Sequence, residues 1–284
     1  MMPLNLKLGF VFVNYNNSLT TIKLIDSLKR QNTDIYFPII IVDNLSNNEN
    51  INILRLIQED EVNVKIIFSE INLGYFRGLN CGIGFINENY KDVNCIVVGN
   101  NDLIFPNNFV NSIFNKIQLF NEFPVISPNI ITDDGFHQNP HVIKKISFIR
   151  EIVYDIYYSN HLLANLIGYL SKFSKIITDR ADETEHDKAQ LIYQGHGSCY
   201  ILGPLFLNNF KELFAPTFLF GEEFFLTIQL RKKSYQVYYE PSIKITHECH
   251  SSIGKMPSKK MWQIAKDSHK EYRKYIKLTK FYKL

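Results

Sequence analysis

Short apolar runs that each end in a polar residue recur through the first 105 positions of the chain. They cover residues 8–13, 38–42, 64–68 and 97–99, and the polar residues that follow them are Asn14, Asp43, Asn72 and Asp102. Near-continuous apolar runs of this length are typical of strands in a parallel sheet that is covered on both faces. In such sheets the ligand binds outside the carboxyl ends of the strands, so the pattern predicts a nucleotide-type site at one sheet edge.

Between these runs the apolar residues recur at helical spacing. The spacing predicts helices over about residues 18–28, 48–58, 74–86 and 106–117. Strands and helices that alternate through short polar links indicate an α/β fold. We expect a Rossmann-like, mostly parallel central sheet with helices on both faces and a basic helical extension at the C-terminus.

The second half of the chain is less regular. Residues 145–177 are rich in Ile, Leu, Phe and Tyr at helical spacing, and short strands are expected at 199–202, 235–239 and 243–246. A helix is expected from Glu222 to Lys233, and the last strand ends at His247. We therefore predict one domain over residues 1–254, with halves 1–120 and 121–254, followed by a helical tail over residues 255–284.

Composition narrows the class of protein. A chain of 284 residues with 45% hydrophobic content can bury one large core. Its four cysteines form no CxxC pair, which argues against a structural zinc site and against a disulfide framework. No apolar run approaches the ~20 residues that cross a bilayer, and the first strand begins too early to leave room for a signal peptide. We therefore expect a cytoplasmic protein.

Charge is distributed unevenly along the chain. Residues 255–284 hold ten Lys and Arg against Asp267 and Glu271, and Trp262 and Tyr272 are among their aromatic residues at near-helical spacing. A basic helix with an aromatic side can lie on an anionic membrane surface. Two alternatives stay open: the aromatic side packs on the domain while the lysines remain in solvent, or it forms a homodimer interface.

Asp43 and the loop around Gly74 are candidate nucleotide contacts. Asp43 ends a predicted strand, so its carboxylate could accept hydrogen bonds from a base or ribose; alternatively it forms a turn with Ser46. Gly74 opens a predicted helix that also carries Arg77. Glycine lets the backbone approach a ligand, and a helix N-terminus favours phosphate.

The run Asn100-Asn101-Asp102 is a candidate metal site. A carboxylate at a strand end suits a hard divalent cation that also binds substrate phosphates and keeps several waters. One protein carboxylate suffices when a diphosphate supplies the other oxygens. The alternative is an Asx turn.

Glu222 and Glu223 are adjacent acids in an aromatic stretch at the start of a predicted helix. Burial and mutual repulsion would raise the pKa of at least one of them, which suits a general base near neutral pH; helix capping by the first acid is the alternative. His247 could be a metal ligand or a phosphate donor. His196, between two glycines, could shape an acceptor pocket or simply occupy a turn.

Taken in order, these motifs resemble family 2 glycosyltransferases with the GT-A fold. The closest branch builds bacterial surface polysaccharides and includes rhamnosyltransferase-like members, and the resemblance covers roughly residues 7–255. The motifs are Val13-Asn14-Tyr15-Asn16, Ile41-Val42-Asp43-Asn44-Leu45-Ser46, Asn72-Leu73-Gly74-Tyr75-Phe76-Arg77-Gly78-Leu79-Asn80, Asn100-Asn101-Asp102, Gly197-Ser198-Cys199-Tyr200-Ile201-Leu202, Phe220-Gly221-Glu222-Glu223, and His247 with Ser251-Ser252-Ile253-Gly254-Lys255.

The resemblance implies a role for each motif on the donor side. The residues that would hold the nucleobase and ribose are Asn14, Tyr15, Asn16 and Asp43, and those that would lie along the nucleotide are Asn72, Gly74 and Arg77. Residues 100–102 occupy the family's Asp-X-Asp motif, with Asp102 facing Mn²⁺ or Mg²⁺ and His247 as a further ligand of the metal or diphosphate. Asn100 in place of the first Asp weakens the charge of this metal site.

On the acceptor side, Glu223 matches the second acid of the family's Glu-Asp pair, the catalytic base. Because Glu replaces the commoner Asp, Glu222 stays open as the base. The implied reaction moves a sugar with inversion from a nucleotide-diphosphate sugar to a hydroxyl of a saccharide or lipid-linked saccharide, at the inner face of the plasma membrane. Residues 1–120 would bind the donor and residues 121–254 the acceptor.

Two other classes of function stay open. A nucleotidyltransferase normally needs a Gly-rich, basic loop after the first strand, where this chain has Asn14-Tyr15-Asn16-Asn17. A catalytically inactive sugar- or protein-binding domain is favoured by the missing first Asp, but the retained Asp102, Glu223 and His247 argue against it. A dehydrogenase is disfavoured because no GxGxxG follows the first strand.

Overall fold

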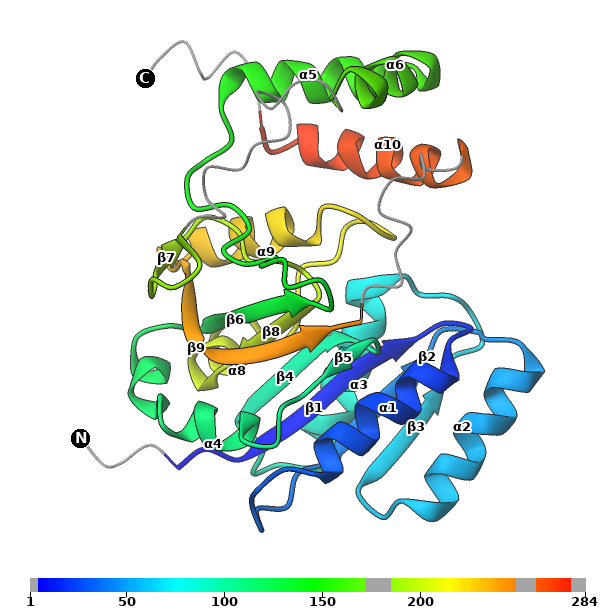
Figure 1. Cartoon of the computed structure of the whole chain (residues 1–284), viewed down its shortest axis with the longest axis vertical. Coiled ribbons are helices and arrows are strands. Elements are labelled where there is room, and N and C mark those ends of the chain that lie inside the picture. The colour runs from blue at the N-terminus through cyan, green and yellow to red at the C-terminus, as the bar shows by residue number, and fades with distance from the viewer. Residues whose placement is uncertain (1–4, 172–184, 249–258, 277–284) are drawn as a thin grey trace.

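A nine-stranded sheet forms the centre of the computed structural model, which describes residues 5–171, 185–248 and 259–276 (Figure 1). The strand order is β3-β2-β1-β4-β8-β6-β9-β5, and β7 pairs with β9 outside this path. The strands are β1 (Leu8–Asn14), β2 (Ile39–Asp43), β3 (Val64–Phe68), β4 (Cys95–Asn100), β5 (Leu103–Ile104), β6 (Val125–Thr132), β7 (Gln190–Ile192), β8 (Cys199–Leu202) and β9 (Val237–His247).

Helices surround this sheet. They are α1 (Ser18–Lys29), α2 (Asn48–Asp60), α3 (Tyr75–Asn89), α4 (Phe109–Phe114), the 3-10 helix η1 (Ile117–Asn121), α5 (Phe148–Ser159), α6 (His161–Ser171), α8 (Pro204–Phe210), α9 (Glu222–Arg231) and α10 (Lys259–Arg273). Among the described helices, none is both long and apolar enough to cross a bilayer.

The first half forms the predicted block of parallel strands, β3-β2-β1-β4. Alternate residues of β1 face opposite sides of the sheet: Phe10 and Phe12 belong to the core with Leu24 of α1, whereas Val11 belongs to the core with Leu79 of α3. Burial of both faces explains why the strands read as near-continuous apolar runs. The predicted α/β class, with helices on both faces of the sheet, is confirmed.

The second half adds strands of both directions. β8 runs antiparallel to β4 and β6, while β6 and β9 are parallel, with a register irregularity after Pro128. The two short strands expected at 235–239 and 243–246 are one strand, β9, because the irregularity accommodates the intervening residues and the Glu240 carboxylate accepts hydrogen bonds from Ser242. β5 pairs antiparallel with β9 and places Leu103 opposite His247.

Helices α5, α6 and α10 form a separate layer beyond α9 (Figure 1). The ring centroid of Tyr272 on α10 lies 4.2 Å from that of Phe224 on α9. Trp262 Nε1 donates to the Tyr157 carbonyl of α5 at 3.2 Å, and Arg273 of α10 pairs with Glu151 of α5 at 2.8 Å. The aromatic side of the basic tail therefore packs on the protein, which was one of the alternatives open from the sequence.

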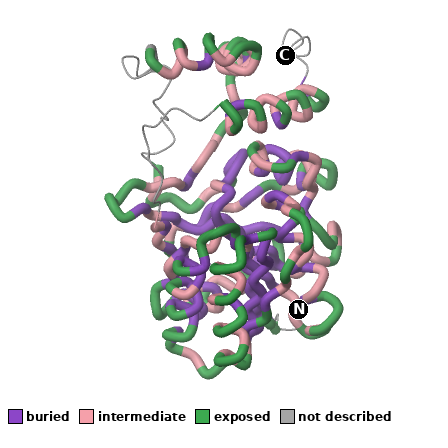
Figure 2. Tube along the Cα trace, turned by 90° about the vertical axis from the view of Figure 1, so that its right-hand side faces the viewer, coloured by how far each residue is buried: buried purple, intermediate pink, exposed green. Residues whose placement is uncertain are grey.

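The rest of that tail is not part of the described structure. Residues 255–258 and 277–284, and the Ser251-Ser252-Ile253-Gly254-Lys255 motif, lie outside the described residues. Figure 2 shows that buried residues concentrate in the sheet and the helices that cover it, whereas the layer of α5, α6 and α10 is mostly exposed or intermediate.

Candidate functional site

The carboxyl ends of β1, β2 and β4 meet in one buried network centred on Asn14. The Asn14 amide donates to Asp43 Oδ1 at 2.7 Å and to Ser46 Oγ at 3.1 Å. Its Oδ1 accepts from Asn101 Nδ2 and from Thr21 Oγ1, both at 3.0 Å. The structure thus brings together three of the residues that the sequence singled out: Asn14, Asp43 and Asn101.

Asp43 forms the Asp/Ser turn that stayed open as its alternative. The Ser46 backbone N–H donates to Asp43 Oδ2 at 3.0 Å, and the Ser46 hydroxyl donates to Oδ1. The side chain is 1% exposed and both oxygens accept hydrogen bonds from the protein. In this arrangement Asp43 positions the Asn14 loop, and its contact with a base or ribose stays a prediction.

Tyr15 and Asn16 follow Asn14 at the same edge. Tyr15 is 55% exposed, so its ring is accessible to a ligand. Asn16 has a positive φ of 51°, and its Oδ1 accepts from the Asn47 backbone at 2.8 Å. Asparagine tolerates this left-handed conformation better than most residues do, which suits a tight turn that presents Tyr15.

The loop that carries Asn72 and Gly74 packs against the Phe218 backbone in the second half of the chain. Gly74 has φ of 81°, and a Cβ there would lie 2.0 Å from the Phe218 carbonyl oxygen. That oxygen accepts from the Tyr75 backbone at the start of α3 at 3.1 Å, and Asn72 Oδ1 accepts from Gly74 N at 3.0 Å. The glycine is needed for this close approach of two loops.

Arg77 also contacts the loop before α9. Its Nε donates to the Ala215 carbonyl at 3.1 Å. Asn80, one turn further along α3, exchanges two hydrogen bonds with the Leu213 backbone, at 2.7 and 2.8 Å. The contacts of Gly74 and Arg77 hold the loop that leads into α9. That these residues also lie along the nucleotide stays a prediction.

Asp102 and His247 lie side by side because β5 pairs with β9. His247 Nε2 is 2.9 Å from Asp102 Oδ1, and the Glu248 backbone donates to the Asp102 carbonyl at 2.9 Å. His247 Nδ1 is 2.7 Å from Gln138 Oε1. Because an amide oxygen only accepts, Nδ1 carries a proton, and Nε2 is the ring atom that faces Asp102.

Gln138 is a residue that the sequence reasoning missed. It lies in the polar segment Asp133-Asp134-Gly135-Phe136-His137-Gln138, which has no spacing that marks a site. Its backbone N–H donates to the Ile130 carbonyl at 2.9 Å, so the end of β6 positions it. A partner that fixes the tautomer of a histidine is a recurrent feature around metal-binding imidazoles.

The side chains of Asp102 and His247 fit a cation that takes most of its ligands from outside the protein. Within residues 5–171, 185–248 and 259–276, no three His, Cys, Asp or Glu side chains converge on a common point. Asp102 and His247 supply one oxygen and one nitrogen, so a divalent cation held there would take its other ligands from water and substrate phosphates. The Asn100 backbone is anchored on the Ser198 carbonyl at 2.9 Å, at the end of β4.

Glu222 and Glu223 open α9 after two residues of positive φ, Phe220 and Gly221. Glu222 is 7% exposed, and its Oε1 has no hydrogen-bond partner among the residues described. Burial, together with the neighbouring charge of Glu223, raises the pKa of Glu222 to about 8. Glu223 is less buried, and its Oε1 accepts from the Gly197 backbone at 3.1 Å.

His196 connects the two parts of the site. Its ring centroid lies 6.2 Å from that of His247 and 5.4 Å from that of His141. The next residue, Gly197, contacts Glu223, and a Cβ at Gly197 would lie 2.6 Å from Glu223 Oε1. Thus a continuous line of contacts runs from Asp102 through His247 and His196 to Glu223.

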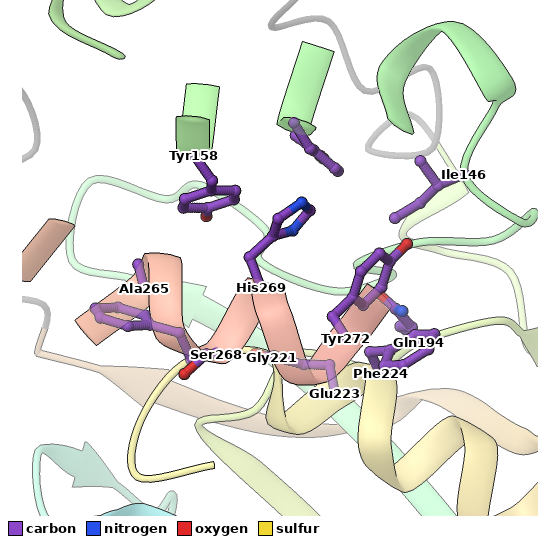
Figure 3. A pocket seen from close by; sticks show the side chains of 12 residues that line it. Ile146, Tyr158, Gln194, Gly221, Glu223, Phe224, Ala265, Ser268, His269 and Tyr272 are labelled. Atoms are coloured by element: carbon purple, nitrogen blue, oxygen red, sulfur yellow. The ribbon is translucent and has the colours of Figure 1, made fainter. Parts of the chain in front are cut away.

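Beyond Glu223 lies a cavity of about 150 Å³ between α5, α9 and α10 (Figure 3). Figure 3 shows the His269 ring between the rings of Tyr158 and Tyr272, and it stacks on both of them. The cavity is lined by Ile146, Tyr154, Tyr158, Gln194, Phe220, Gly221, Glu223, Phe224, Ala265, Ser268, His269 and Tyr272. The acid pair, the metal-type pair and the cavity therefore lie along one side of the sheet's polar edge.

The fold is that of GT-A glycosyltransferases, and solved structures of that class match this chain. The solved structures below share less than 25% sequence identity with this chain, so their similarity establishes the fold alone. The family model described as glycosyl transferase family 2 matches residues 10–178, more than half of the chain. The chain therefore belongs to glycosyl transferase family 2.

Three solved structures represent the match. TarS 1–349 from S. aureus is 11% identical with a TM-score of 0.55 and covers 86% of this chain and 60% of its own. GalNAc-T7 with UDP, GalNAc and Mn²⁺ is 12% identical with a TM-score of 0.59, covering 86% and 44%. The mannosyltransferase PcManGT from Pyrobaculum calidifontis with GDP-Man and Mn²⁺ is 13% identical with a TM-score of 0.55, covering 89% and 59%.

The chain thus spans less than two thirds of the length of these three structures. No curated protein matches it significantly.

Proposed function

We propose that this protein transfers a sugar from a nucleotide-diphosphate sugar to a hydroxyl of a saccharide or lipid-linked saccharide, with inversion and with a divalent metal, in the synthesis of a bacterial surface polysaccharide. The observation that carries the proposal is the line of contacts joining the Asp102–His247 pair to Glu223. In the proposed reaction, Asp102 and His247 would bind the diphosphate of the donor, and the Glu223 carboxylate would act as the general base on the other side of the reaction centre.

The donor end comprises the strand termini of the first half. The exposed Tyr15 ring and the Asn14 loop would receive the nucleobase and ribose, with Asn16, Asp43, Asn72 and Gly74 shaping that edge. Asp102 and His247 would hold Mn²⁺ or Mg²⁺ near Asn100 and Asn101, and the bound cation would neutralise charge on the departing diphosphate. Relatives that carry UDP-GlcNAc, or GDP-Man with Mn²⁺, support this use of the fold.

At the other end Glu223 would be the base. A carboxylate that takes the acceptor's hydroxyl proton turns a weak nucleophile into a strong one. Glu222 is the weaker candidate because its raised pKa keeps it largely protonated at neutral pH. Attack from the face opposite the leaving diphosphate forms the new C–O bond as the old one breaks, which inverts the anomeric carbon.

The other two classes of function receive less support. The loop after the first strand holds Asn14, Asn16 and Asn17 and has no basic residue, whereas a nucleotidyltransferase uses a basic residue there to bind triphosphate. A catalytically inactive domain has no evident need for a partly exposed Glu223 that lines a cavity next to the metal-type pair.

The proposal is tested by Glu223→Gln. Hydrolysis or transfer from a panel of UDP-, GDP- and dTDP-sugars with Mn²⁺ should fall by at least about 100-fold, because the base is lost. Nucleoside diphosphate affinity should stay within about twofold, since the donor end is untouched. Glu59→Gln, the same change on exposed α2, is the control. Equal loss in Glu59→Gln, or full turnover by Glu223→Gln, would contradict the assignment; loss in Glu222→Gln alone would transfer the role to Glu222.

We further propose that the protein works at the cytoplasmic face of the membrane, on a lipid-linked acceptor. The contact surface differs from the one expected for residues 255–284, because the aromatic side of α10 is packed on α5 and α9. The alternative surface is the outer face of α5 and α6, here called the apolar face, whose exposed residues are Ile149, Ile152, Ile156, Leu162, Leu163, Leu166 and Tyr169.

The charge around the apolar face suits anionic lipid. Glu151 and Asp155 are the only acids in α5 and α6. Both turn to α10, where Arg273 pairs with each of them. The apolar face therefore presents no unpaired acid to an anionic membrane. The exposed lysines of α10, Lys259, Lys260 and Lys270, lie in the same layer.

A further inference from the structure

Building on the proposed function, we propose that the cavity between α5, α9 and α10 is the acceptor site, and that it binds a pyranose ring of a saccharide by stacking it against tyrosine and phenylalanine rings. The cavity is separate from the donor edge: it begins at Glu223 and extends away from Asp102 and His247. Four segments far apart in the sequence form it, namely residues 146–158, Gln194, residues 220–224 and residues 265–272 of α10.

The walls have the composition that a sugar ring needs. Five aromatic side chains line the cavity: Tyr154, Tyr158, Phe220, Phe224 and Tyr272. The C–H faces of a pyranose are apolar, so they pack on aromatic rings as other apolar groups do. Ligand sites of this kind are mostly apolar, with a few polar groups that fix the orientation.

Polar groups inside the cavity remain available for hydroxyls. Within the part of the chain that the structure describes, no hydrogen bond engages the Gln194 side-chain amide or the hydroxyls of Tyr154 and Tyr158. A sugar offers several hydroxyls that both donate and accept, and would satisfy all three groups at once.

The other polar groups of the cavity hold its frame. The Tyr272 hydroxyl donates to Glu151, and His269 Nε2 lies 2.8 Å from Asp155 Oδ1. The Tyr158 ring stacks on His269 with a centroid distance of 4.5 Å. These contacts fix the spacing between α5 and α10, so the cavity is formed before any ligand arrives.

Glu223 sets the direction of the bound sugar. Of the described residues lining the cavity, it alone is acidic, and it also reaches Gly197 on the donor side. A hydroxyl at this end of the ring would give its proton to Glu223 while its oxygen bonds to the anomeric carbon of the donor. The bond from that carbon to the diphosphate breaks, and the diphosphate keeps the electron pair.

The experiment uses methyl glycosides of common hexopyranoses as probes. Saturation-transfer NMR on the full chain should detect binding of at least one of them, with the strongest signals on C–H protons of the ring. In Tyr154→Ala and Gln194→Met the acceptor KM should rise by about tenfold, because a stacking surface or a pair of hydrogen bonds is lost. Donor hydrolysis without acceptor should remain at the wild-type rate.

Tyr169→Ala, the same truncation on α6 outside the cavity, is the matched control and should bind glycosides as wild type does. Tyr158→Phe, which keeps the ring, should lose less affinity than Tyr154→Ala. Wild-type protein that hydrolyses donor but binds no glycoside, or variants that bind as wild type does, would overturn the inference and leave the proposed function standing. Glycoside binding without any donor hydrolysis would instead overturn the proposed function.

Discussion

At the residue scale, the site depends on which ring nitrogen of His247 faces Asp102. Nδ1 lies 2.7 Å from Gln138 Oε1 and Nε2 lies 2.9 Å from Asp102 Oδ1, so both ring nitrogens have a hydrogen-bond partner and the imidazole is held from two sides. One oxygen and one nitrogen donor are thus oriented in advance toward the place where a cation would bind.

Asp102→Ala should abolish the metal-dependent part of nucleoside diphosphate binding, and Gln138→Leu should weaken it by about tenfold because the imidazole loses its orientation. Titration calorimetry of UDP and GDP, with Mn²⁺ and with EDTA, measures both effects. Asp133→Ala, an exposed acid in the segment before Gln138, is the control. Binding that is insensitive to metal in wild type and unchanged in Asp102→Ala would show that this pair holds no cation.

Burial of Glu222 makes the free energy of unfolding depend on pH, with lower stability at higher pH. Its pKa rises from 4.5 to about 8 on folding, so the folded protein binds more protons between these values. Stability is therefore full below the unfolded pKa and declines as pH rises through about 8. From about pH 5 to about pH 9, wild type should lose on the order of 2 kcal/mol relative to Glu222→Gln, which cannot ionise.

Urea unfolding followed by circular dichroism at both pH values measures this difference. Glu59→Gln on exposed α2 should follow the wild-type profile. The same pH dependence in wild type and Glu222→Gln would mean that Glu222 ionises in the folded state as easily as in the unfolded one.

At the element scale, α9 is held in place from both sides. Gly74 and Arg77 fix the loop before it, and Tyr272 of α10 packs on Phe224. The N-terminus of α9 carries Glu222 and Glu223, where the helix dipole favours acidic side chains. Gly74 and Arg77, which we expect to contact nucleotide, thus also determine where the acid pair lies.

The apolar face of α5 and α6 gives a prediction at the same scale. Full-length protein should co-sediment with phosphatidylglycerol vesicles, less so at raised salt. Ile149→Glu with Leu162→Glu should weaken this binding by at least about tenfold, because two apolar side chains are lost from the contact and two negative charges are added.

Leu56→Glu with Val62→Glu is the matched control, since both residues are exposed outside this layer. Its vesicle binding should equal that of wild type. A wild-type protein that ignores anionic vesicles at low salt would refute the membrane contact, and a dimer that only the Ile149→Glu, Leu162→Glu variant disrupts would show the apolar face to be a subunit interface.

At the scale of the whole molecule, the two halves of the sheet contribute different residues to the candidate site. The parallel block ends in the Asn14 network, and the mixed half delivers His247, His196 and Glu223 to the same edge. The layer of α5, α6 and α10 then covers the acid pair and creates the cavity (Figure 1). The domain boundary at residue 254 remains a proposal, although α10 packs on the body as part of this layer.

The hydrophobic pattern alone determined the α/β class, the presence of the first strands and the edge at which Asn14, Asp43 and Asp102 lie. Parallel strands point their carboxyl ends the same way, so polar residues after successive strands must gather at one edge. The order of the motifs indicated the family. It also distinguished Glu223 and His247 from the other acidic residues and histidines of the chain.

Only the tertiary structure decided which of these side chains meet. Asp102 contacts His247 across 145 positions, because β5 pairs with β9, and Gln138 joins them from the end of β6. The same long-range packing gave Asp43 and Arg77 contacts with distant segments and separated a buried Glu222 from a partly exposed Glu223. Contacts between distant segments depend on strand order and on burial in three dimensions, and periodicity along the chain encodes neither.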